Sequence, residues 1–464
     1  MLHSSFDDAQ QQGTPNFFLI DAQPEAKITS SILLEACRQI KRNRIQYLRD
    51  TPTEDIVSII SGISENWTDD LYPFRKRALD EGPSKTGFSR SSIAHGLDQF
   101  FTKITEENLL NLIAQELGDS RRLDSPLGTP EERAENRSSM ARGPELITII
   151  TAGSPPCPTI MTMIHGLIVR SAQFIKCADK GGFIPRLFAH SLYESHPKIG
   201  SCIEISSWPG TEPTLEKILF DESDCIIATG RDETINSIRS KITNDKKFIG
   251  YGQKVSLAYI QKDMLSRAMA RELAKSAAQD IASWNQLGCL SPHIIYIEKG
   301  GAVSPELFSG MLAESLAAIE NLQPRGDIPA EIDGDILYKR KFFESRALRT
   351  GDVRQWSSET DTSWTVVFEE DPLFTTSCQN RFIHVKSIND IDEMLRVAEM
   401  TRGQVSTVGL SAPKNEAEIL FKKLAHWGVT RICPIGKMQE PALGWRHDGR
   451  PTIADLVSWT DWEQ

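Results

Sequence analysis

The sequence of 464 residues lacks the features that mark several large classes of protein. It contains no apolar run near the ~18 residues that a membrane-spanning helix needs. Its first ten residues are polar and acidic, without the apolar core of a signal peptide. The net charge is −11, and no basic block supplies the clustered Lys and Arg that nucleic-acid binding requires. We therefore expect a cytoplasmic protein with no transmembrane segment and no nucleic-acid partner.

Cysteine is sparse and scattered, with no C-x-x-C pair and no Cys/His cluster at the spacing of a zinc site. The eight cysteines are Cys37, Cys157, Cys177, Cys202, Cys225, Cys289, Cys378 and Cys433. We expect them to be reduced thiols, some of them reactive, and we expect no metal site. Hydrophobic residues make up 39% and charged residues 25%, which is typical of a folded globular chain. The length indicates two or three domains.

Several familiar motifs are also missing. There is no G-x-G-x-x-G, no G-x-x-x-x-G-K-[ST], no H-E-x-x-H and no G-x-S-x-G. The segment Gly82-Pro-Ser-Lys-Thr-Gly has some likeness to a phosphate loop, but its Lys precedes the second Gly and no strand leads into it. We interpret it as a surface turn. A dinucleotide can still bind a parallel sheet without these fingerprints, in the crevice at the carboxyl ends of the strands.

Hydrophobic periodicity predicts a mostly helical first third, with a charged connecting loop at 121–142. The helices are expected at 31–48, 52–63 (with Thr51 as the cap), 71–79 and 105–117. Strands then alternate with helices. The first set of strands is expected at 146–151, 172–176, 200–206, 224–230 and 247–251, and the second at 255–260, 293–297, 363–369, 381–386, 404–410 and 431–434. The last residues, with Trp459 and Trp462, are expected to form a helix that docks on a core or on a neighbouring subunit.

This alternation predicts an α/β fold with two doubly wound parallel-sheet domains behind a helical N-terminal segment. The expected divisions are a helical segment at 1–120, a dinucleotide-binding domain at 121–254, a catalytic thiol domain at 255–435 and a C-terminal tail at 436–464.

Cys289 is the strongest candidate for chemistry. It lies in Trp284-Asn-Gln-Leu-Gly-Cys-Leu-Ser-Pro-His, at a Gly-flanked turn between a long helix and a short strand. Such a turn can expose a thiol, which is a strong nucleophile when ionised, and its backbone N–H groups can stabilise an oxyanion. The alternative is a buried structural cysteine. His293, four residues on, could tune the thiol, although a histidine entering a strand is more often a packing residue.

Seven segments, in order, give the chain a resemblance to the LuxC-type acyl-CoA reductases, a branch of the aldehyde dehydrogenase superfamily. They run from about Arg121 to the C-terminus and are Arg122-Leu-Asp, Thr151-Ala-Gly-Ser-Pro-Pro, Phe174-Ile-Lys-Cys-Ala-Asp, Asp224-Cys-Ile-Ile-Ala-Thr-Gly, Gly250-Tyr-Gly-Gln-Lys-Val-Ser, Gln286-Leu-Gly-Cys-Leu-Ser-Pro-His, and Arg431-Ile-Cys-Pro-Ile-Gly-Lys-Met with Trp445-Arg-His-Asp-Gly. Each segment alone is weakly specific, and their ordered set is the argument.

The resemblance implies an aldehyde-dehydrogenase-like fold and reduction of a long-chain acyl thioester to the fatty aldehyde. Cys289 would carry the acyl group as a thioester, and NADPH, with NADH possible, would supply the hydride. The acyl donor would be acyl-CoA, an acyl carrier or an acyl-protein partner, and the protein would be a homo-oligomer.

The resemblance also implies cofactor-binding residues. Lys176 matches the lysine at a strand end that binds the adenosine ribose, and Asp179 stands where an acidic residue bonds the ribose 2′-hydroxyl. Asp179 would favour NADH, whereas the family is associated with NADPH. Thr229 and Gly230 match the turn where the cofactor lies, before a helix that could direct N–H groups at phosphate.

Two positions depart from the superfamily pattern. Gly250, the first residue of Gly250-Tyr-Gly-Gln-Lys, stands where the hydrolytic enzymes of the superfamily have a glutamate base. Without that base, an acyl-enzyme would survive attack by water. Ser154 stands in place of the asparagine of the oxyanion hole. His447-Asp448 could form an acid/base pair, but Asp-Gly favours a surface turn.

Three alternatives remain open from the sequence. The first is a CoA-acylating dehydrogenase that oxidises a shorter aldehyde. The second is a non-catalytic scaffold that binds acyl donors or a partner, and the third is a simple nucleotide-binding protein.

Overall fold

The computed structural model describes residues 28–151, 153, 155–178, 181–208, 210 and 212–464. The chain forms two compact units, named here by their principal sheets. The five-strand unit comprises the chain up to Ala78, Leu97–Gly252 and Ala442–Gln464, and the seven-strand unit comprises Leu79–Gly96 and Gln253–Pro441. The C-terminal tail and most of the N-terminal helical segment, expected as separate segments, thus fold together with the first sheet, whereas Leu79–Gly96 belongs to the seven-strand unit.

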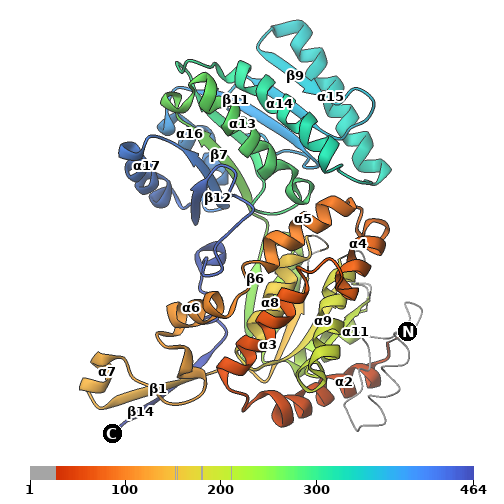
Figure 1. The fold of residues 1–464 in the computed structure, drawn as a ribbon, viewed down its shortest axis with the longest axis vertical. Helices are drawn as coiled ribbons and strands as arrows, with labels where there is room; N and C mark the ends of the chain where they lie inside the picture. The colour runs from red at the N-terminus through yellow and green to blue at the C-terminus, as the bar shows by residue number, and fades with distance from the viewer. Residues whose placement is uncertain (1–27, 152, 154, 179–180, 209, 211) are drawn as a thin grey trace. The chain divides into compact units, whose positions relative to one another are not determined.

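The five-strand unit contains a fully parallel sheet in the order β4-β3-β2-β5-β6. Figure 1 labels its edge strand β6, together with the helices α3, α8, α9 and α11 of the same unit. Its strands are β2 (Leu146–Ile150), β3 (Ala172–Cys177), β4 (Ile203–Ser207), β5 (Cys225–Thr229) and β6 (Lys247–Tyr251). The helices of this part of the chain are α2 (Ser30–Asn43), α3 (Thr53–Asn66), α6 (Glu106–Leu117), α7 (Pro130–Ala134), α8 (Cys157–Ile168), α9 (Phe183–Ser195), α10 (Pro197–Gly200), α11 (Pro213–Glu222) and α12 (Asp232–Lys241). Shorter turns are a π-helical turn Arg44–Leu48 and 3₁₀ turns Ser120–Leu123 and His447–Gly449.

Alternation along β3 shows how both faces of this sheet are covered. Phe174 packs in one core cluster with apolar residues of α2 and α11. The neighbouring Gln173 donates a hydrogen bond to the carbonyl of Met163 in α8. Because successive strand residues point to opposite faces, α2 and α11 cover one face and α8 covers the other.

The seven-strand unit contains a sheet in the order β13-β12-β7-β8-β11-β10-β9, in which only β9 is antiparallel to its neighbour. Its strands are β7 (Val255–Ile260), β8 (Pro292–Glu298), β9 (Val353–Ser357), β10 (Thr365–Glu369), β11 (Phe382–Ile388), β12 (Val405–Ser411) and β13 (Arg431–Pro434). Its helices are α13 (Arg267–Ala282), α14 (Pro305–Leu322), α15 (Ala330–Thr350), α16 (Ile391–Val397) and α17 (Lys414–Trp427), with 3₁₀ turns Lys262–Met264, Ser283–Gln286 and Glu399–Thr401. Two further helices, α4 (Pro73–Thr86) and α5 (Arg90–Phe101), run from one unit into the other.

The core of this unit lies on both faces of its sheet. Ala258 and Ile260 of β7 pack with α13 and α14, whereas Leu257 and Tyr259 pack with α16 and α17. The strands are nearly continuous runs of apolar residues, as expected for a parallel sheet covered on both sides. The predicted α/β class, with two doubly wound parallel sheets and a helical N-terminal segment, is confirmed.

Several local predictions were wrong. The expected loop at 121–142 contains α7 and the strand β1 (Arg137–Arg142). The expected C-terminal helix is the strand β14 (Ser458–Glu463), which pairs antiparallel with β1. Strand pairing between segments more than 300 residues apart leaves no local signal. Trp459 and Trp462, expected to dock, are 42% and 56% exposed in this chain.

Other differences are smaller. The Gly82-Pro-Ser-Lys-Thr segment is not a turn but the last part of α4, which ends at Thr86. Pro52, not Thr51, occupies the cap position of α3. The pattern also gave no prediction for α5, α15 or β9, whose interrupted apolar spacing is weak. Among the described residues, no helix is both long and apolar enough to cross a membrane.

Candidate active site

Cys289 follows an elbow of strained backbone. After α13 ends at Ala282, Trp284, Asn285 and Gln286 all adopt left-handed conformations, with φ of 49°, 53° and 63°. For residues other than glycine, each such conformation costs about 1–2 kcal/mol. All three residues are buried, so the surrounding structure holds the strain in place. Cys289 itself is half-buried in the turn that follows.

Hydrogen bonds fix the elbow from several sides. The Gln286 side-chain amide donates to the carbonyls of Pro292 (2.8 Å) and Phe382 (3.0 Å). The Asn285 carbonyl accepts from the Asn380 backbone N–H at 3.0 Å. Asn380 belongs to a second left-handed run of three residues. The two strained runs therefore support each other directly.

The indole of Trp284 anchors the elbow. It packs edge-on against Phe88, with ring centroids 5.1 Å apart. A side chain at Gly96 of α5 would overlap the indole ring, so only glycine allows this close approach. Phe88, just before α5, and Gly96, within it, thus form the surface against which Trp284 packs.

One row of residues crosses four strands at the amino edge of the seven-stranded sheet. Pro292 of β8 pairs with Ser256 of β7, Ser256 with Thr407 of β12, and Thr407 with Arg431 of β13. The Ser256 hydroxyl donates to the Cys289 carbonyl at 2.6 Å and accepts from the Thr407 N–H at 3.2 Å. The turn carrying the candidate nucleophile is thereby bonded to the edge of the sheet.

A loop after β13 braces the same turn. The Asp280 carboxylate accepts from the backbone N–H groups of Gly436 (2.5 Å) and Met438 (3.0 Å). The Gln439 side chain donates to the Ser291 hydroxyl at 2.9 Å. Burial raises the pKa of Asp280 to about 7, although the backbone N–H groups act in the opposite direction. A carboxyl group that titrates near neutral pH thus lies beside the predicted active site.

His293 cannot supply a charge to the thiol near neutral pH. It is 5% exposed on β8, and burial together with the nearby His384 lowers its pKa to about 4. The imidazole is therefore neutral at pH 7. The packing alternative describes His293 better than the tuning role.

Most other cysteines are held as thiols. Burial raises the pKa of Cys433 to about 11, and those of Cys37, Cys202 and Cys225 to about 12. At neutral pH these residues are poor nucleophiles.

In the five-strand unit, the strand order reverses between β2 and β5. In such sheets ligands bind at the carboxyl ends of the strands that flank the reversal. Thr229 is the last residue of β5 and Gly230 follows it, so both lie at this edge. However, the Gly230 N–H is already bonded to the Tyr251 carbonyl at 3.1 Å.

The helix after this turn is poorly suited to phosphate. α12 begins at Asp232, and its first turn carries the carboxylates of Asp232 and Glu233. These anions already complement the positive end of the helix dipole and would repel a phosphate. The sequence-based idea of a phosphate at this helix is not supported.

Lys176 is near the end of β3, in a charged cluster. Its Nζ lies 3.1 Å from Oε1 of Glu216, and the Lys241 Nζ lies 2.7 Å from Oε2 of the same carboxylate. Burial opposes ionisation of Glu216, but hydrogen bonds from the two lysines lower its pKa below the usual range. The cluster offers both donors and an acceptor, with one positive charge in excess. Asp179 and Ser154 lie outside the described residues.

Gly250 leaves no room for a catalytic base. A Cβ added there would lie 2.7 Å from Cγ2 of Ile235 and 3.0 Å from Phe248. A glutamate at this position would require the surrounding packing to move. The packing of Ile235 and Phe248 therefore favours glycine at position 250, where the superfamily pattern has a glutamate.

His447 is not on a free surface turn, as was expected. Its ring stacks on Tyr251 with centroids 4.4 Å apart, and the Arg450 guanidinium lies 4.9 Å from the Tyr251 ring. Burial lowers the pKa of His447, with the Asp448 charge acting against this. The tail thus covers the Gly250-Tyr-Gly segment.

Glu369 is committed to a buried ion cluster. Its carboxylate lies 2.7 Å from Arg346, 3.3 Å from His384 and 3.4 Å from Lys386. Burial alone would raise its pKa, but the His384 hydrogen bond and the neighbouring positive charges lower it to about 2. This carboxylate is a structural ion rather than a free ligand group.

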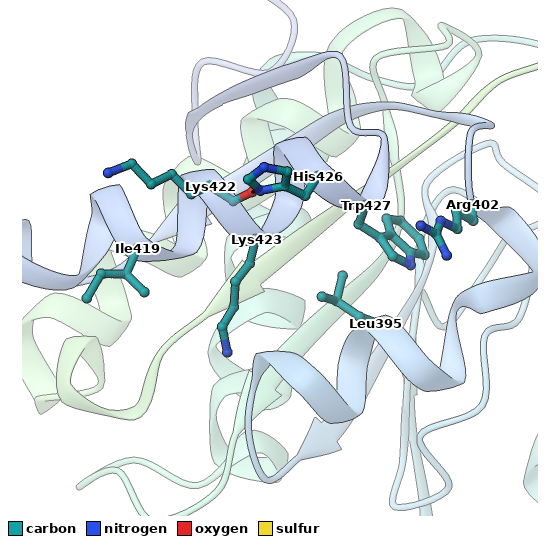
Figure 2. A pocket seen from close by; sticks show the side chains of 7 residues that line it. All are labelled: Leu395, Arg402, Ile419, Lys422, Lys423, His426 and Trp427. Atoms are coloured by element: carbon teal, nitrogen blue, oxygen red, sulfur yellow. Dashed lines mark hydrogen bonds between the residues drawn. The ribbon is translucent and has the colours of Figure 1, made fainter.

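A surface pocket of about 480 Å³ lies elsewhere in the seven-strand unit. Figure 2 shows its lining: Leu395, Arg402, Ile419, Lys422, Lys423, His426 and Trp427. Its arginine and both lysines are paired with carboxylates of Glu399, Glu418 and Asp392, so the pocket has no unpaired strong cation to attract an anion. Within the described ranges, no cluster of three or more His, Cys, Asp or Glu residues is arranged to hold a metal.

Sequence reasoning singled out Cys289 as the candidate nucleophile but gave no signal for the residues that brace its turn. Ser256, Thr407 and Asp280 lie in ordinary strand and helix patterns, without any signal of their own. Arg431 was within a quoted segment, yet only the strand register brings it into one row with Ser256.

Comparison with known proteins identifies the family and the fold of the chain. The family model for acyl-CoA reductase (LuxC) matches residues 48–459. No curated protein sequence matches the chain.

Solved structures with the same fold are aldehyde dehydrogenases of low sequence identity. An NAD-dependent benzaldehyde dehydrogenase from Corynebacterium glutamicum has a TM-score of 0.67 at 13% identity, over 97% of this chain and 94% of that one. A variant of betaine aldehyde dehydrogenase from Staphylococcus aureus has 0.66 at 11%, over 94% and 88%. Proline utilization A from Bradyrhizobium japonicum has 0.70 at 13%, over 94% of this chain but only 45% of that longer one. The fold is thus that of the aldehyde dehydrogenases.

Proposed function

Because the chain belongs to the acyl-CoA reductase (LuxC) family, we propose that it reduces a long-chain fatty acyl-CoA to the fatty aldehyde through a thioester on Cys289. The observation that carries this proposal is the strained, cross-braced elbow that presents a half-buried cysteine. Strain held in place by its surroundings is typical of active sites.

In the first step, the Cys289 thiolate attacks the acyl carbonyl. The bond between the acyl carbon and the CoA sulfur breaks, and CoA leaves as its thiol after taking up a proton. The acyl group is now a thioester of Cys289. The backbone N–H groups of the turn are suited to stabilise the oxyanion that forms on the way.

A bound nicotinamide dinucleotide supplies the hydride that reduces the acyl carbon. The elbow and its hydrogen bonds hold the Cys289 sulfur in place while the tetrahedral oxyanion collapses. The carbon–sulfur bond breaks, the aldehyde is released and the thiolate is restored. Acyl-CoA, NADPH and one proton thus give aldehyde, CoA and NADP⁺.

The five-strand unit offers groups that fit such a cofactor. Lys176 and Glu216 supply a donor and an acceptor for ribose hydroxyls near the end of β3. With Lys241, the cluster has two lysines and one carboxylate and therefore a net positive charge. This charge supports NADPH over NADH, because the 2′-phosphate of NADPH is anionic. Lys176, Thr229 and Gly230 remain our proposed cofactor residues, together with Asp179, three positions after Lys176 in the sequence.

The closed packing at Gly250 supports aldehyde as the product. Without a carboxylate at this position, water is poorly activated for attack on the acyl-enzyme. We therefore expect the aldehyde, rather than the free acid, to dominate.

The test is aldehyde formation from acyl-CoAs of increasing chain length, with NADPH or NADH. Cys289→Ala is expected to lower kcat by about 10³-fold or more, because the covalent path is lost. Cys378→Ala, which removes another half-buried thiol of the same unit, is the matched control and should retain activity. Without reductant, mass spectrometry should find an acyl adduct on the peptide containing Cys289. An active Cys289→Ala enzyme would contradict the mechanism.

A further inference from the structure

The candidate nucleophile needs a positive charge nearby if it is to ionise near neutral pH. The obvious source, His293, is neutral because burial lowers its pKa to about 4. Another cation of the seven-strand unit, Arg431, lies close to the thiol turn.

Arg431 is in the right place by strand register. It occupies the same row at the amino edge of the sheet as Thr407 and Ser256. Paired residues of parallel strands project to the same face, so these three side chains share a face. Ser256 bonds the Cys289 carbonyl at 2.6 Å, and Arg431 reaches the Thr407 hydroxyl at 3.5 Å.

The guanidinium is also fixed by the loop that braces the thiol turn. Its two terminal nitrogens donate to the carbonyls of Met438 and Lys437, each at 2.7 Å. The next residue, Gln439, bonds Ser291, two positions beyond Cys289. The arginine thus belongs to one continuous set of contacts that ends at the reactive turn.

Burial lowers the pKa of Arg431, and the nearby Cys433, Asp280, Cys289 and Glu440 act against this. The guanidinium is therefore within electrostatic reach of the Cys289 sulfur. Lys437, on the same loop, is an exposed cation paired with Glu440.

We propose that Arg431 is a positioning residue for Cys289, which holds the bracing loop and stabilises the negative charge on the sulfur. The inference relies on the proposed function only in taking Cys289 as the reacting thiol. No ligand or acyl donor is needed to test it, because thiolate reactivity can be measured directly.

The experiment follows the rate of Cys289 alkylation by iodoacetamide from pH 5 to 10, read by mass spectrometry on its own peptide. Arg431→Gln is expected to move the midpoint of the profile up by about one pH unit and to slow alkylation at pH 7 by about tenfold. Arg431→Lys keeps the charge and should restore most of the midpoint. Arg402→Gln makes the same change at an exposed arginine of the same unit, which is paired only with Glu399, and should leave the profile unchanged.

Asp280→Asn is an independent variant with the opposite expected effect. It removes a carboxylate whose charge interacts with the Arg431 guanidinium, and it should lower the pH midpoint of Cys289 alkylation. An unmoved midpoint in folded Arg431→Gln, or a uniform loss of rate at every pH, would overturn the proposal in favour of a merely structural arginine. If Arg431→Gln does not fold, the Asp280→Asn variant decides. An alkylation midpoint that is unchanged or raised in Asp280→Asn would also overturn the proposal.

The outcomes separate this inference from the proposed function. If wild-type Cys289 takes up no acyl group from acyl-CoA while the midpoint still depends on Arg431, the reduction proposal fails and the inference stands. If acylation occurs but the midpoint ignores Arg431, only the inference fails.

Discussion

The two principal sheets carry their candidate residues at opposite edges. Cys289 lies at the amino edge of the seven-stranded sheet, in a turn held by hydrogen bonds from β7, the loop after β13 and its own elbow. Thr229 and Lys176 lie at or near the carboxyl ends of strands in the five-stranded sheet, where loops begin. The first arrangement fixes one atom rigidly, whereas the second leaves side chains to exchange one ionic partner for another. We expect this difference between a site for covalent chemistry and a site for a reversible ligand.

The largest expected effect is on the pH dependence of the free energy of unfolding, and it comes from the titration of Asp280 beside the Cys289 turn. Burial raises the pKa of this carboxyl group from its ordinary value of 3.8 to about 7. The folded state therefore binds more protons than the unfolded state between about pH 4 and pH 7. Its contribution is fully present below pH 4 and is lost as the pH rises through about 7, by about 1.4 kcal/mol per pH unit within that window.

Urea unfolding followed across this pH range checks the sign. Asp280→Asn should flatten the decline of the free energy of unfolding, whereas Asp221→Asn, at an exposed pair with Lys217, should not. A decline of equal slope in wild type and Asp280→Asn would contradict the assignment.

The next effect concerns the elbow. Gln286→Leu removes both hydrogen bonds from the buried amide and leaves the carbonyls of Pro292 and Phe382 without that donor. The Phe382 carbonyl keeps its hydrogen bond from the Ser377 hydroxyl. We therefore expect a loss of about 1–3 kcal/mol in the free energy of unfolding, the cost of one buried group that loses its donor. Alkylation of Cys289 should also become less selective over the other cysteines. Unchanged stability would show that the elbow is not held as described.

The smallest effect is expected in the five-strand unit. Lys176→Ala should raise the KM for the nicotinamide cofactor by about tenfold, equivalent to about 1.4 kcal/mol, and leave kcat within about twofold. Steady-state kinetics with varied NADPH separate the two constants. Lys217→Ala, at an exposed lysine of the neighbouring helix α11, is the matched control and should change neither. A fall in kcat without a change in KM would remove Lys176 from the cofactor site.

Periodicity was enough to predict the parallel strands of both sheets, since buried parallel strands are short apolar runs. It failed for β1 and β14, whose pairing is decided by a partner far away in the chain. At the candidate site, the turn of Cys289 was visible from its flanking glycine. The left-handed conformations of Trp284, Asn285 and Gln286 were not visible. Trp and Gln rarely adopt this conformation and Asn does so mainly as a single residue, so tertiary contacts must impose a run of three.

The pairing of β14 with β1 has a consequence for how the chain acquires its structure. All of the seven-strand unit lies between the portions of chain that build the five-strand unit. During synthesis, β1 emerges early, but β14 is translated only after Pro441, the last residue of the nested unit. Since domains fold as units while the chain is being made, the sheet that carries Cys289 can assemble before β14 pairs with β1. The unit that begins first is the one that finishes last.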